Sequence, residues 1–350
     1  MRGLVIKSTG SSYIVRLDDG TDVECRIKGN FRIRGIRSTN PVAVGDYVEV
    51  NLTGEAGLTA ERSNSVNGLT GEAGHIGWIT DVEERRNYII RRSTNLSKES
   101  HIIAANIDQV ALIVTVNHPV TSTTFIDRYL ATCEAYRVPA ILIFNKIDLL
   151  NDDELEQLAS LRDLYEGLGY ETVAISAKDL TPYTVHLTSL LEGKTTLLSG
   201  NSGVGKSTLL NALFGREMTR TGKISDAHDK GMHTTTFSEM YFLEEKNERT
   251  KDEGNLSPFT FHPSALIDTP GIKGFGGIDM QRDEVSHYFR EIFRIGHNCR
   301  FSNCTHTGEP GCAVQDAVFN EDLEASERIA MSRFESYLSL LGDCTENKYR

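Results

Sequence analysis

A glycine-rich stretch in the second half of the chain has the residue types and spacing of a phosphate-binding loop. Its sequence, Gly-Asn-Ser-Gly-Val-Gly-Lys-Ser, occupies Gly200–Ser207 and matches the P-loop pattern of a glycine, any four residues, and then Gly-Lys-Ser or Gly-Lys-Thr. Glycines let successive backbone N–H groups turn toward phosphate oxygens, and the positive end of the helix that follows attracts the same anion. We therefore predict that a nucleotide contacts Gly200, Asn201, Ser202, Gly203, Val204, Gly205, Lys206, Ser207 and Thr208.

Two side chains of this loop have a predicted role in the chemistry. Lys206 can reach the β- and γ-phosphates, and the Ser207 hydroxyl can ligate Mg²⁺. A chance match to so short a pattern is the alternative interpretation. An apolar strand predicted at 195–199 and a helix predicted after the loop supply the context that a true P-loop requires. The loop predicts a nucleotide, but it does not say which base.

A second motif predicts that the base is guanine. Residues 140–144 are typical of a buried strand and lead into Asn145-Lys146-Ile147-Asp148, the pattern N-K-x-D. The Asp148 carboxylate can accept hydrogen bonds from N1–H and the 2-amino group of guanine, whereas adenine lacks this donor pair and would leave a desolvated carboxylate unpaired. Asn145 and the aliphatic part of Lys146 would complete the base site.

Two more motifs each close a predicted strand. Ser176-Ala177-Lys178 resembles the S-A-K element, whose backbone N–H reads guanine O6. Asp268-Thr-Pro-Gly271 fits the D-x-x-G pattern, in which Asp268 would hold Mg²⁺ through water and the N–H of Gly271 would sense the γ-phosphate. Each short motif alone could be an ordinary turn, but together with the P-loop they predict a GTPase.

The order of these motifs predicts a circular permutation. In ordinary GTPases the P-loop precedes D-x-x-G, N-K-x-D and S-A-K, whereas here N-K-x-D and S-A-K come first and D-x-x-G comes last. Helical patterns at Phe125–Tyr136 and Asp152–Leu168 alternate with apolar strands, which indicates a doubly wound α/β sheet. A permuted sheet can keep its site, because ligands bind at the carboxyl ends of the strands whatever the chain order.

The stretch Met-His-Thr-Thr-Thr, before D-x-x-G, stands at the place of the first switch. A threonine hydroxyl there would complete the Mg²⁺ shell when the γ-phosphate is present. We assign this role to Thr235, with Thr234 or Thr236 as open alternatives, and a run of threonines also suits an ordinary strand. Ile272 stands where many GTPases have a water-orienting glutamine, so we expect a low intrinsic rate of hydrolysis.

Residues 1–92 are typical of an all-β domain. Short alternating strands are separated by turn-forming residues, and their number and spacing favour a small barrel of the OB-fold type. Within it, Arg26–Arg37 carries five cations, no anion and the aromatic residue Phe31, a pattern typical of binding to an RNA backbone. A solvated basic loop is the alternative interpretation.

Four potential metal ligands cluster near the C-terminus: Cys299, Cys304, His306 and Cys312. Three thiolates and one imidazole form a closed tetrahedral set, which is the pattern of a structural zinc ion rather than a catalytic one. Four packing residues are the alternative, and the nearby His297 is a less suitable ligand than His306.

Length and composition suit a multidomain protein. The chain has 350 residues and a formal net charge of −12, which argues against indiscriminate coating of nucleic acid. No apolar run reaches the ~18 residues of a membrane span and no signal-peptide pattern begins the chain, so we expect a cytoplasmic protein without membrane contact. The predicted domains are an OB-fold RNA-binding domain (1–92), a permuted GTPase domain (93–280) and a helical zinc-binding domain (281–350). In the last domain, Gln315–Leu341 is expected to be helical, with Ala330, Phe334, Leu338 and Leu341 on one face that packs against the zinc site.

These features together resemble the ribosome small-subunit-dependent GTPase A family (RsgA, also called YjeQ). The resemblance spans the chain and is carried by the P-loop, N-K-I-D, S-A-K, M-H-T-T-T and D-T-P-G in permuted order, and by the Cys/His cluster. It implies hydrolysis of GTP to GDP, stimulated by the small (30S) ribosomal subunit, in the late maturation of that subunit. It also implies that the OB-fold and zinc-binding domains contact rRNA and that His233 orients the attacking water, with a structural role for this histidine as the alternative.

Other functions fit parts of the pattern. A metabolic P-loop kinase would need no N-K-x-D motif, and a pure RNA-binding module would tolerate a dead P-loop, whereas Lys206, Ser207 and Asp268 are intact here. A GTPase acting on another ribosomal site or another structured RNA is the nearest alternative. Potassium activation stays open, because potassium-dependent relatives among GTPases often have asparagine at the place of Gly203. We expect a monomer whose cofactors are GTP or GDP, Mg²⁺ and one structural Zn²⁺.

Overall fold

The computed structural model describes residues 1–10, 12–27, 41–52, 76–92, 100–218, 238–243, 264–269, 280–324 and 327–346. The chain divides into two compact units. The first comprises Met1–Ile107, Thr235–Phe242 and Leu266–Pro270, and the second comprises Asp108–Thr234, Leu243–Ala265 and Gly271–Arg350. The predictions for most of the basic stretch with Phe31, for His233 and Thr234–Thr236, and for Gly271 and Ile272 lie outside the described residues.

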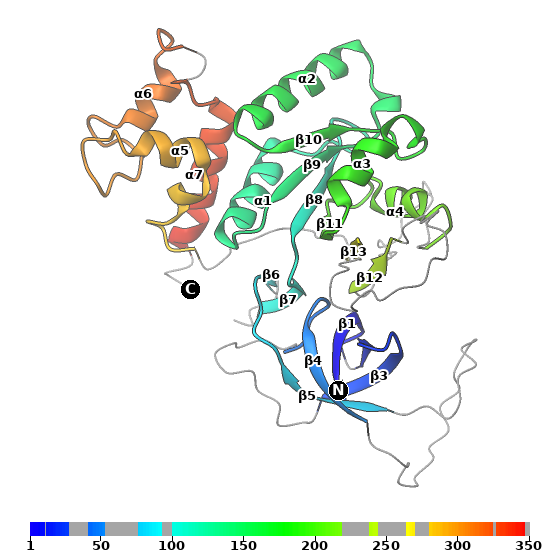
Figure 1. Ribbon diagram of the computed structural model, residues 1–350. Helices are drawn as coiled ribbons and strands as arrows, with labels where there is room; N and C mark the ends of the chain where they lie inside the picture. Colours follow the sequence, from blue (N-terminus) through cyan, green and yellow to red (C-terminus); the bar gives the residue numbers. More distant parts are fainter. Residues whose placement is uncertain are drawn as a thin grey trace, which may run out of the picture. The chain divides into compact units, whose positions relative to one another are not determined.

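Five strands of the first unit close into a barrel (Figure 1). They are β1 (Arg2–Ser8), β2 (Tyr13–Leu17), β3 (Asp22–Ile27), β4 (Tyr47–Leu52) and β5 (Gly77–Val82). Their order is β1-β2-β3-β5-β4, and β4 pairs back with β1. Alternate side chains point inward, so Val5, Val15 and Ile79 are fully buried in one core. This closed order confirms the predicted OB-fold barrel.

The first unit also contains three strands from outside the barrel and most of a fourth, β13, from Leu266 onward. β6 (Tyr88–Arg92) and β7 (Ser100–Ala105) form a separate antiparallel pair, while β12 (Ser238–Phe242) pairs with β1 and is followed in the sheet by β13 (Ala265–Asp268). The Lys7 ammonium lies 3.1 Å from the Glu239 carboxylate across the β1–β12 pair. The barrel therefore holds the strand that comes directly after the predicted switch in the sequence.

The second unit is built on parallel strands in the order β10-β9-β8-β11. They are β8 (Gln109–Val114), β9 (Ala140–Phe144), β10 (Glu171–Ala174) and β11 (Thr195–Ser199). All residues of β8 and β9 are buried, as expected for central strands of a sheet covered on both faces. The helices between and after them are α1 (Thr123–Ala135), α2 (Asp152–Gly167), α3 (Thr184–Leu191) and α4 (Lys206–Phe214), with short 3₁₀ turns η1 (Ile147–Leu149) and η2 (Thr181–Tyr183). This alternation confirms the predicted α/β domain.

The chain after N-K-I-D is fixed by a helix cap. The Asn151 side chain accepts a hydrogen bond from the Glu154 N–H at 2.9 Å, and the Glu154 carboxylate accepts one from the Asn151 N–H at 3.0 Å. This reciprocal pair satisfies two backbone donors at the start of α2. The end of the N-K-x-D segment is therefore anchored to a regular helix.

The C-terminal part of the second unit is helical, but the predicted helix Gln315–Leu341 is wrong as a single element. The helical elements are η3 (Val285–Tyr288), α5 (Arg290–Gly296), α6 (Ala313–Phe319) and α7 (Met331–Glu346). Of the predicted apolar face, Phe334 and Leu341 are buried, whereas Leu338 is 37 % exposed and Ala330 precedes α7. The buried stripe of α7 instead starts at Arg333 and Phe334 and continues through Tyr337 and Leu340.

Arg333 explains this shift of the buried face. Its guanidinium donates to both carboxylate oxygens of Glu291 in α5, at 2.7 and 3.1 Å, and to Asp127 in α1 at 2.8 Å. The Tyr165 hydroxyl of α2 donates to the same Asp127 oxygen at 2.9 Å. All of Arg333, Asp127 and Glu291 are buried, so the ionic network ties the C-terminal helices to α1 within one compact unit. Among the described helices, none combines the length and apolarity needed to span a membrane.

Candidate nucleotide and metal sites

The predicted P-loop connects β11 to α4 in a conformation that only glycine adopts easily. Gly200, Gly203 and Gly205 have φ of 144°, 84° and 99°. A Cβ on Gly200 would lie 2.3 Å from the Ile113 carbonyl oxygen, and one on Gly205 would lie 2.3 Å from Nδ2 of Asn145. The backbone angle therefore favours glycine at all three positions, and the close approach of neighbouring atoms requires it at Gly200 and Gly205.

Lys206, the first residue of α4, is folded back over the loop. Its Nζ donates to the carbonyl oxygens of Gly200 and Asn201, at 2.7 and 2.9 Å. The ammonium thus lies where a phosphate cradled by the loop would meet it. Ser207 and Thr208 follow in the first helical turn, and both are partly exposed.

Asn145 joins the three predicted nucleotide motifs of the second unit. Its side chain is 3 % exposed. Its Nδ2 donates to the Val204 carbonyl in the P-loop at 2.8 Å, and its Oδ1 accepts from the Ala177 N–H in S-A-K at 2.9 Å. The structure therefore brings together segments that are far apart in the permuted sequence. The proposal that a backbone N–H of this stretch reads guanine O6 stays a prediction, and the Ala177 N–H is engaged by Asn145 here.

Asp148 is held by two side chains of the S-A-K segment. The Ser176 hydroxyl and the Lys178 ammonium each lie 2.8 Å from one of its carboxylate oxygens. The hydrogen bond from Lys178, followed by that from Ser176, lowers the pKa of Asp148 below its ordinary value. The sequence analysis predicted only that a backbone N–H of this segment contacts guanine. It missed the contacts of the Ser176 and Lys178 side chains, which keep the Asp148 carboxylate ionised and oriented.

Lys146 connects N-K-x-D to the P-loop. It has a left-handed φ of 66°, and its Nζ donates to the carbonyl oxygens of Gly203, at 2.6 Å, and His118. Burial, with a smaller contribution from Lys178, lowers the pKa of Lys146. The side chain therefore lies along the P-loop, as expected for a lysine whose aliphatic part borders a base. The contact between Lys146 and His118 could not be predicted from the sequence, because the acceptor is a backbone carbonyl, which every residue has.

Asp268 is the last residue of β13 and belongs to the first unit. It is 2 % exposed, and its neighbour Thr269 is 1 % exposed. A buried carboxylate at the end of a strand is the arrangement that the D-x-x-G prediction requires. The remaining predicted residues of this group, His233, Thr235 and Gly271, lie outside the described residues.

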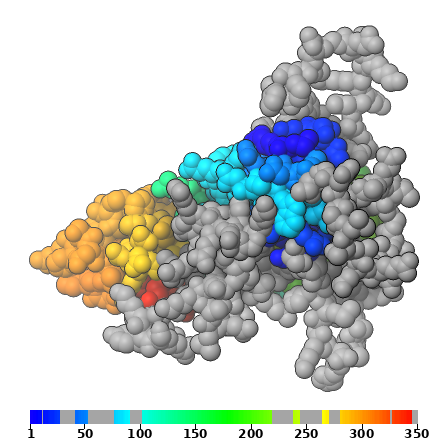
Figure 2. Space-filling view, turned by 90° about the horizontal axis from the view of Figure 1, so that it is seen from below, coloured from blue at the N-terminus to red at the C-terminus, as the bar shows by residue number. Residues whose placement is uncertain are grey.

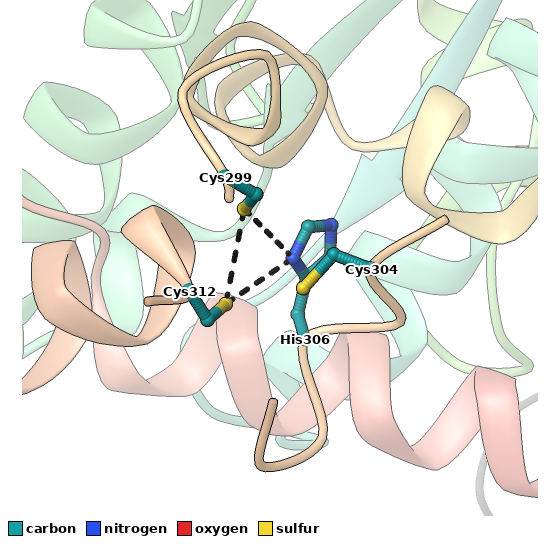
Figure 3. Close-up of side chains that lie close together, drawn as sticks. All are labelled: Cys299, Cys304, His306 and Cys312. Carbon is teal, nitrogen blue, oxygen red and sulfur yellow. Dashed lines mark hydrogen bonds between the residues drawn. The ribbon is translucent and has the colours of Figure 1, made fainter. Parts of the chain in front are cut away.

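The predicted metal ligands converge in the second unit (Figure 3). Cys299, Cys304, His306 and Cys312 each offer one ligand atom, and these atoms all lie within 4.8 Å of one another. Nδ1 of His306 is 3.6 Å from Sγ of Cys299 and 3.4 Å from Sγ of Cys312, and these two sulfurs are 3.9 Å apart. A tetrahedral zinc site would have S···S edges of about 3.8 Å and N···S edges of about 3.6 Å. The donor set and its spacing therefore fit zinc.

Local structure explains how these four side chains meet. Cys299 lies just after α5, while the Sγ of Cys312 caps α6 by accepting from the Gln315 N–H at 3.4 Å. His306 has a left-handed φ of 59°, which turns the chain back between the other ligands, and its ring is 3 % exposed. In Figure 2 the part of the chain around this segment, coloured orange, is visible from outside. Four protein ligands leave no open position, so the site suits a structural ion.

Comparison with known proteins agrees with this geometry. The RsgA GTPase family model matches residues 82–277, and the RsgA N-terminal domain model matches residues 2–57. The small ribosomal subunit biogenesis GTPase RsgA of Phocaeicola vulgatus is 51 % identical over 350 residues, covering 100 % of this chain and 99 % of that protein. The chain belongs to the RsgA GTPase family. It is therefore a GTPase with an N-terminal barrel, a circularly permuted GTPase fold and C-terminal helices that carry a Cys/His cluster.

Another relative and two solved structures also match this chain over nearly its full length. The protein of the same name from Bacteroides fragilis (strain ATCC 25285) is 52 % identical over 351 residues and covers 100 % of this chain. The crystal structure of YjeQ from Thermotoga maritima has a TM-score of 0.64 at 30 % identity, covering 98 % of both chains. The crystal structure of YloQ, described as a circularly permuted GTPase, shares the fold with a TM-score of 0.63 at 24 % identity, covering 100 % of this chain and 96 % of that one.

Proposed function

We propose that this chain hydrolyses GTP to GDP and phosphate in the biogenesis of the small ribosomal subunit, and that the subunit stimulates it. The observation that carries the proposal is the full-length identity of 51 % to curated relatives named for this role. It is supported by the contacts that Asn145 makes with both the P-loop and the S-A-K segment.

The P-loop would hold the phosphates, with Lys206 facing the β- and γ-phosphates. Mg²⁺, when bound, neutralises charge on these phosphates, and Ser207, Thr235 and Asp268 are the residues that would hold it. Gly271 would sense the γ-phosphate through its N–H. The residues that would contact the triphosphate are those from Gly200 to Thr208.

Specificity for guanine would come from Asp148. Its two oxygens are already oriented by Ser176 and Lys178, so accepting N1–H and the 2-amino group requires little reorganisation. An adenine nucleotide offers no matching donors and would leave the carboxylate unpaired. The chain should therefore prefer GTP to ATP by several orders of magnitude.

Stimulation by the ribosomal subunit would compensate for a weak intrinsic site. Ile272 cannot orient a water, and we assign that task to His233, a side chain that both accepts and donates hydrogen bonds. Contact with the subunit would then place this histidine. We propose further that the chain acts in the cytoplasm as a monomer. In this proposal its OB-fold domain (1–92) and its zinc-binding domain (281–350), which flank the GTPase domain (93–280) in the sequence, both contact rRNA.

The proposal is tested by sedimenting the purified chain with small or large ribosomal subunits, loaded with a non-hydrolysable GTP analogue, GDP or an ATP analogue. We expect co-sedimentation with small subunits that is strongest with the GTP analogue and absent with large subunits. Equal binding to both subunits, or to any structured RNA, would favour the alternative of a GTPase that acts on another ribosomal site or another RNA.

A further inference from the structure

One carboxylate organises the loop that carries the histidine ligand of the Cys/His cluster. Oε1 of Glu309 accepts from the Thr305 N–H at 2.7 Å and from the Thr305 hydroxyl at 2.6 Å. Oε2 accepts from the N–H groups of Thr307 and Gly308, at 2.8 and 3.2 Å. Both oxygens are thus used by donors within residues 305–308, and Glu309 is not among the four residues of the cluster.

These hydrogen bonds surround His306 in the sequence. Thr305 and Thr307 flank the histidine, so pinning their N–H groups to one carboxylate fixes the backbone on both sides of it. His306 has a φ of 59°, a left-handed conformation that costs a non-glycine residue about 1–3 kcal/mol and persists only where neighbouring contacts enforce it. Glu309 provides such contacts.

A second side chain holds the same segment from the opposite side. The Tyr337 hydroxyl of α7 donates to the Thr305 carbonyl at 2.8 Å, and its ring centroid lies 6.0 Å from that of His306. Tyr337 is 1 % exposed and is anchored in the core of the C-terminal helices. The segment is therefore tied to α7 through its carbonyl and to Glu309 through its N–H groups.

We propose that Glu309 is a positioning residue for zinc, one that holds His306 in its ligating conformation without touching the metal. The inference rests on the zinc site that we propose for this chain. Groups that orient metal ligands from outside the coordination sphere typically contribute 10- to 100-fold to metal affinity. A purely electrostatic attraction between the Glu309 charge and the metal is the competing explanation, and it predicts a different response to substitution.

The test is an equilibrium competition for zinc between the purified full-length chain and a chromophoric chelator of known affinity. Glu309→Ala should bind zinc roughly 10-fold more weakly or worse. Glu309→Gln keeps one acceptor oxygen and should lie between wild type and Glu309→Ala. Glu321→Ala removes an exposed carboxylate that follows α6, outside the segment around His306, and should match wild type. Tyr337→Phe should weaken binding by a few-fold.

Each outcome is decisive. If the wild-type chain takes up no zinc, the proposed metal site itself fails and the inference falls with it. If wild type binds zinc and Glu309→Ala binds it within about twofold of wild type, the positioning role alone is wrong. Equal losses in Glu309→Ala and Glu309→Gln would show that charge, not positioning, is the cause. If Glu309→Ala also loses GDP binding, we take it to be misfolded. The test then rests on Glu309→Gln and Tyr337→Phe, and zinc affinities equal to wild type in both variants would overturn the proposal.

Discussion

At the scale of single residues, the guanine recognition that we propose depends on how the Asp148 carboxylate is held. Asp148 is oriented by the Ser176 hydroxyl and the Lys178 ammonium, each at 2.8 Å. Lys178 also lowers the pKa of the carboxyl, so the group is ionised throughout the neutral range. A carboxylate fixed in this way can accept two donors of guanine without first reorganising.

Asp148→Asn should weaken GTP binding by roughly 10²- to 10⁴-fold, because an amide presents one N–H to a base edge that itself has two donors. Xanthine has a carbonyl in place of the 2-amino group, so the same variant should bind XTP better than GTP. Titration with fluorescent nucleotides measures both affinities. Asp163→Asn, at an exposed position of α2, is the matched control, and unchanged GTP affinity in Asp148→Asn would exclude Asp148 as the guanine ligand.

Two glycines allow the cost of backbone strain to be measured separately from the cost of steric crowding. Gly205 and Gly215 both have left-handed φ, 99° and 63°, but only at Gly205 does an added Cβ meet a neighbour, the Asn145 side chain at 2.3 Å. Gly205→Ala should lower GDP affinity at least ~10-fold, whereas Gly215→Ala should cost only about 1 kcal/mol of stability and leave GDP binding unchanged. Calorimetry and thermal unfolding distinguish the two, and equal GDP affinities in both variants would contradict the account of the loop.

Residue-level prediction from the sequence succeeded where chemistry dictates both type and spacing. The four Cys/His side chains lie in one short motif, so their convergence could be predicted, and the structure confirms it. The side-chain partners of Asp148 could not be assigned, because Ser176 is 28 positions away and its hydroxyl meets the carboxylate only when two loops come together. Glu309 had no signal at all, since its partners are backbone N–H groups of its own loop.

At the scale of helices and strands, the buried network around Arg333 links the C-terminal helices to α1. Its guanidinium lies between Glu291 of α5 and Asp127 of α1, and all three side chains are at most 4 % exposed. Such a network is weak as a source of net stability but costly to break on one side, because a charge is then left buried and unpaired.

Arg333→Met should therefore destabilise the chain by about 3–5 kcal/mol. Replacing all three charged groups together, in Arg333→Met with Asp127→Leu and Glu291→Leu, should recover most of that loss. Arg294→Met, an exposed position on α5, serves as the control. Denaturant unfolding gives the free energies, and a triple variant less stable than Arg333→Met would show that the network stabilises the fold rather than specifying its packing.

The same network explains which element could not be predicted. The helices α1 and α2 and the strands β9 and β11 follow clear apolar patterns, and their predicted positions are confirmed within two residues. The helix predicted at Gln315–Leu341 is instead broken between α6 and α7. Its buried face includes Arg333, which any apolar pattern excludes, and the acids that pair with it lie 42 and 206 positions away.

At the scale of the whole molecule, the permutation places the D-x-x-G strand late in the chain, before the helices that carry the metal cluster. Those helices share a core that includes Ala131 of α1. A metal ion bound by the Cys/His cluster would therefore stabilise helices that pack on the GTPase fold, while the nucleotide motifs lie on other segments.

Loss of the metal should consequently affect stability more than nucleotide binding. Cys312→Ser should abolish zinc binding and lower the midpoint of thermal unfolding by at least ~5 °C, while changing GDP affinity by less than ~3-fold. Cys344→Ser removes a thiol outside the cluster and should keep the zinc. Metal analysis, thermal scans and GDP titration make the comparison, and a zinc-free variant with an unchanged midpoint would contradict the structural role of the metal.

The most direct test of the central claim is the rate of GTP hydrolysis with and without purified small ribosomal subunits, with large subunits as the control. We predict a low rate for the chain alone, a rate at least ~10-fold higher with small subunits only, and no activity in Lys206→Ala under either condition. A rate that no ribosomal particle changes would contradict the proposed role in small-subunit biogenesis, although the guanine-nucleotide chemistry of the site would stand.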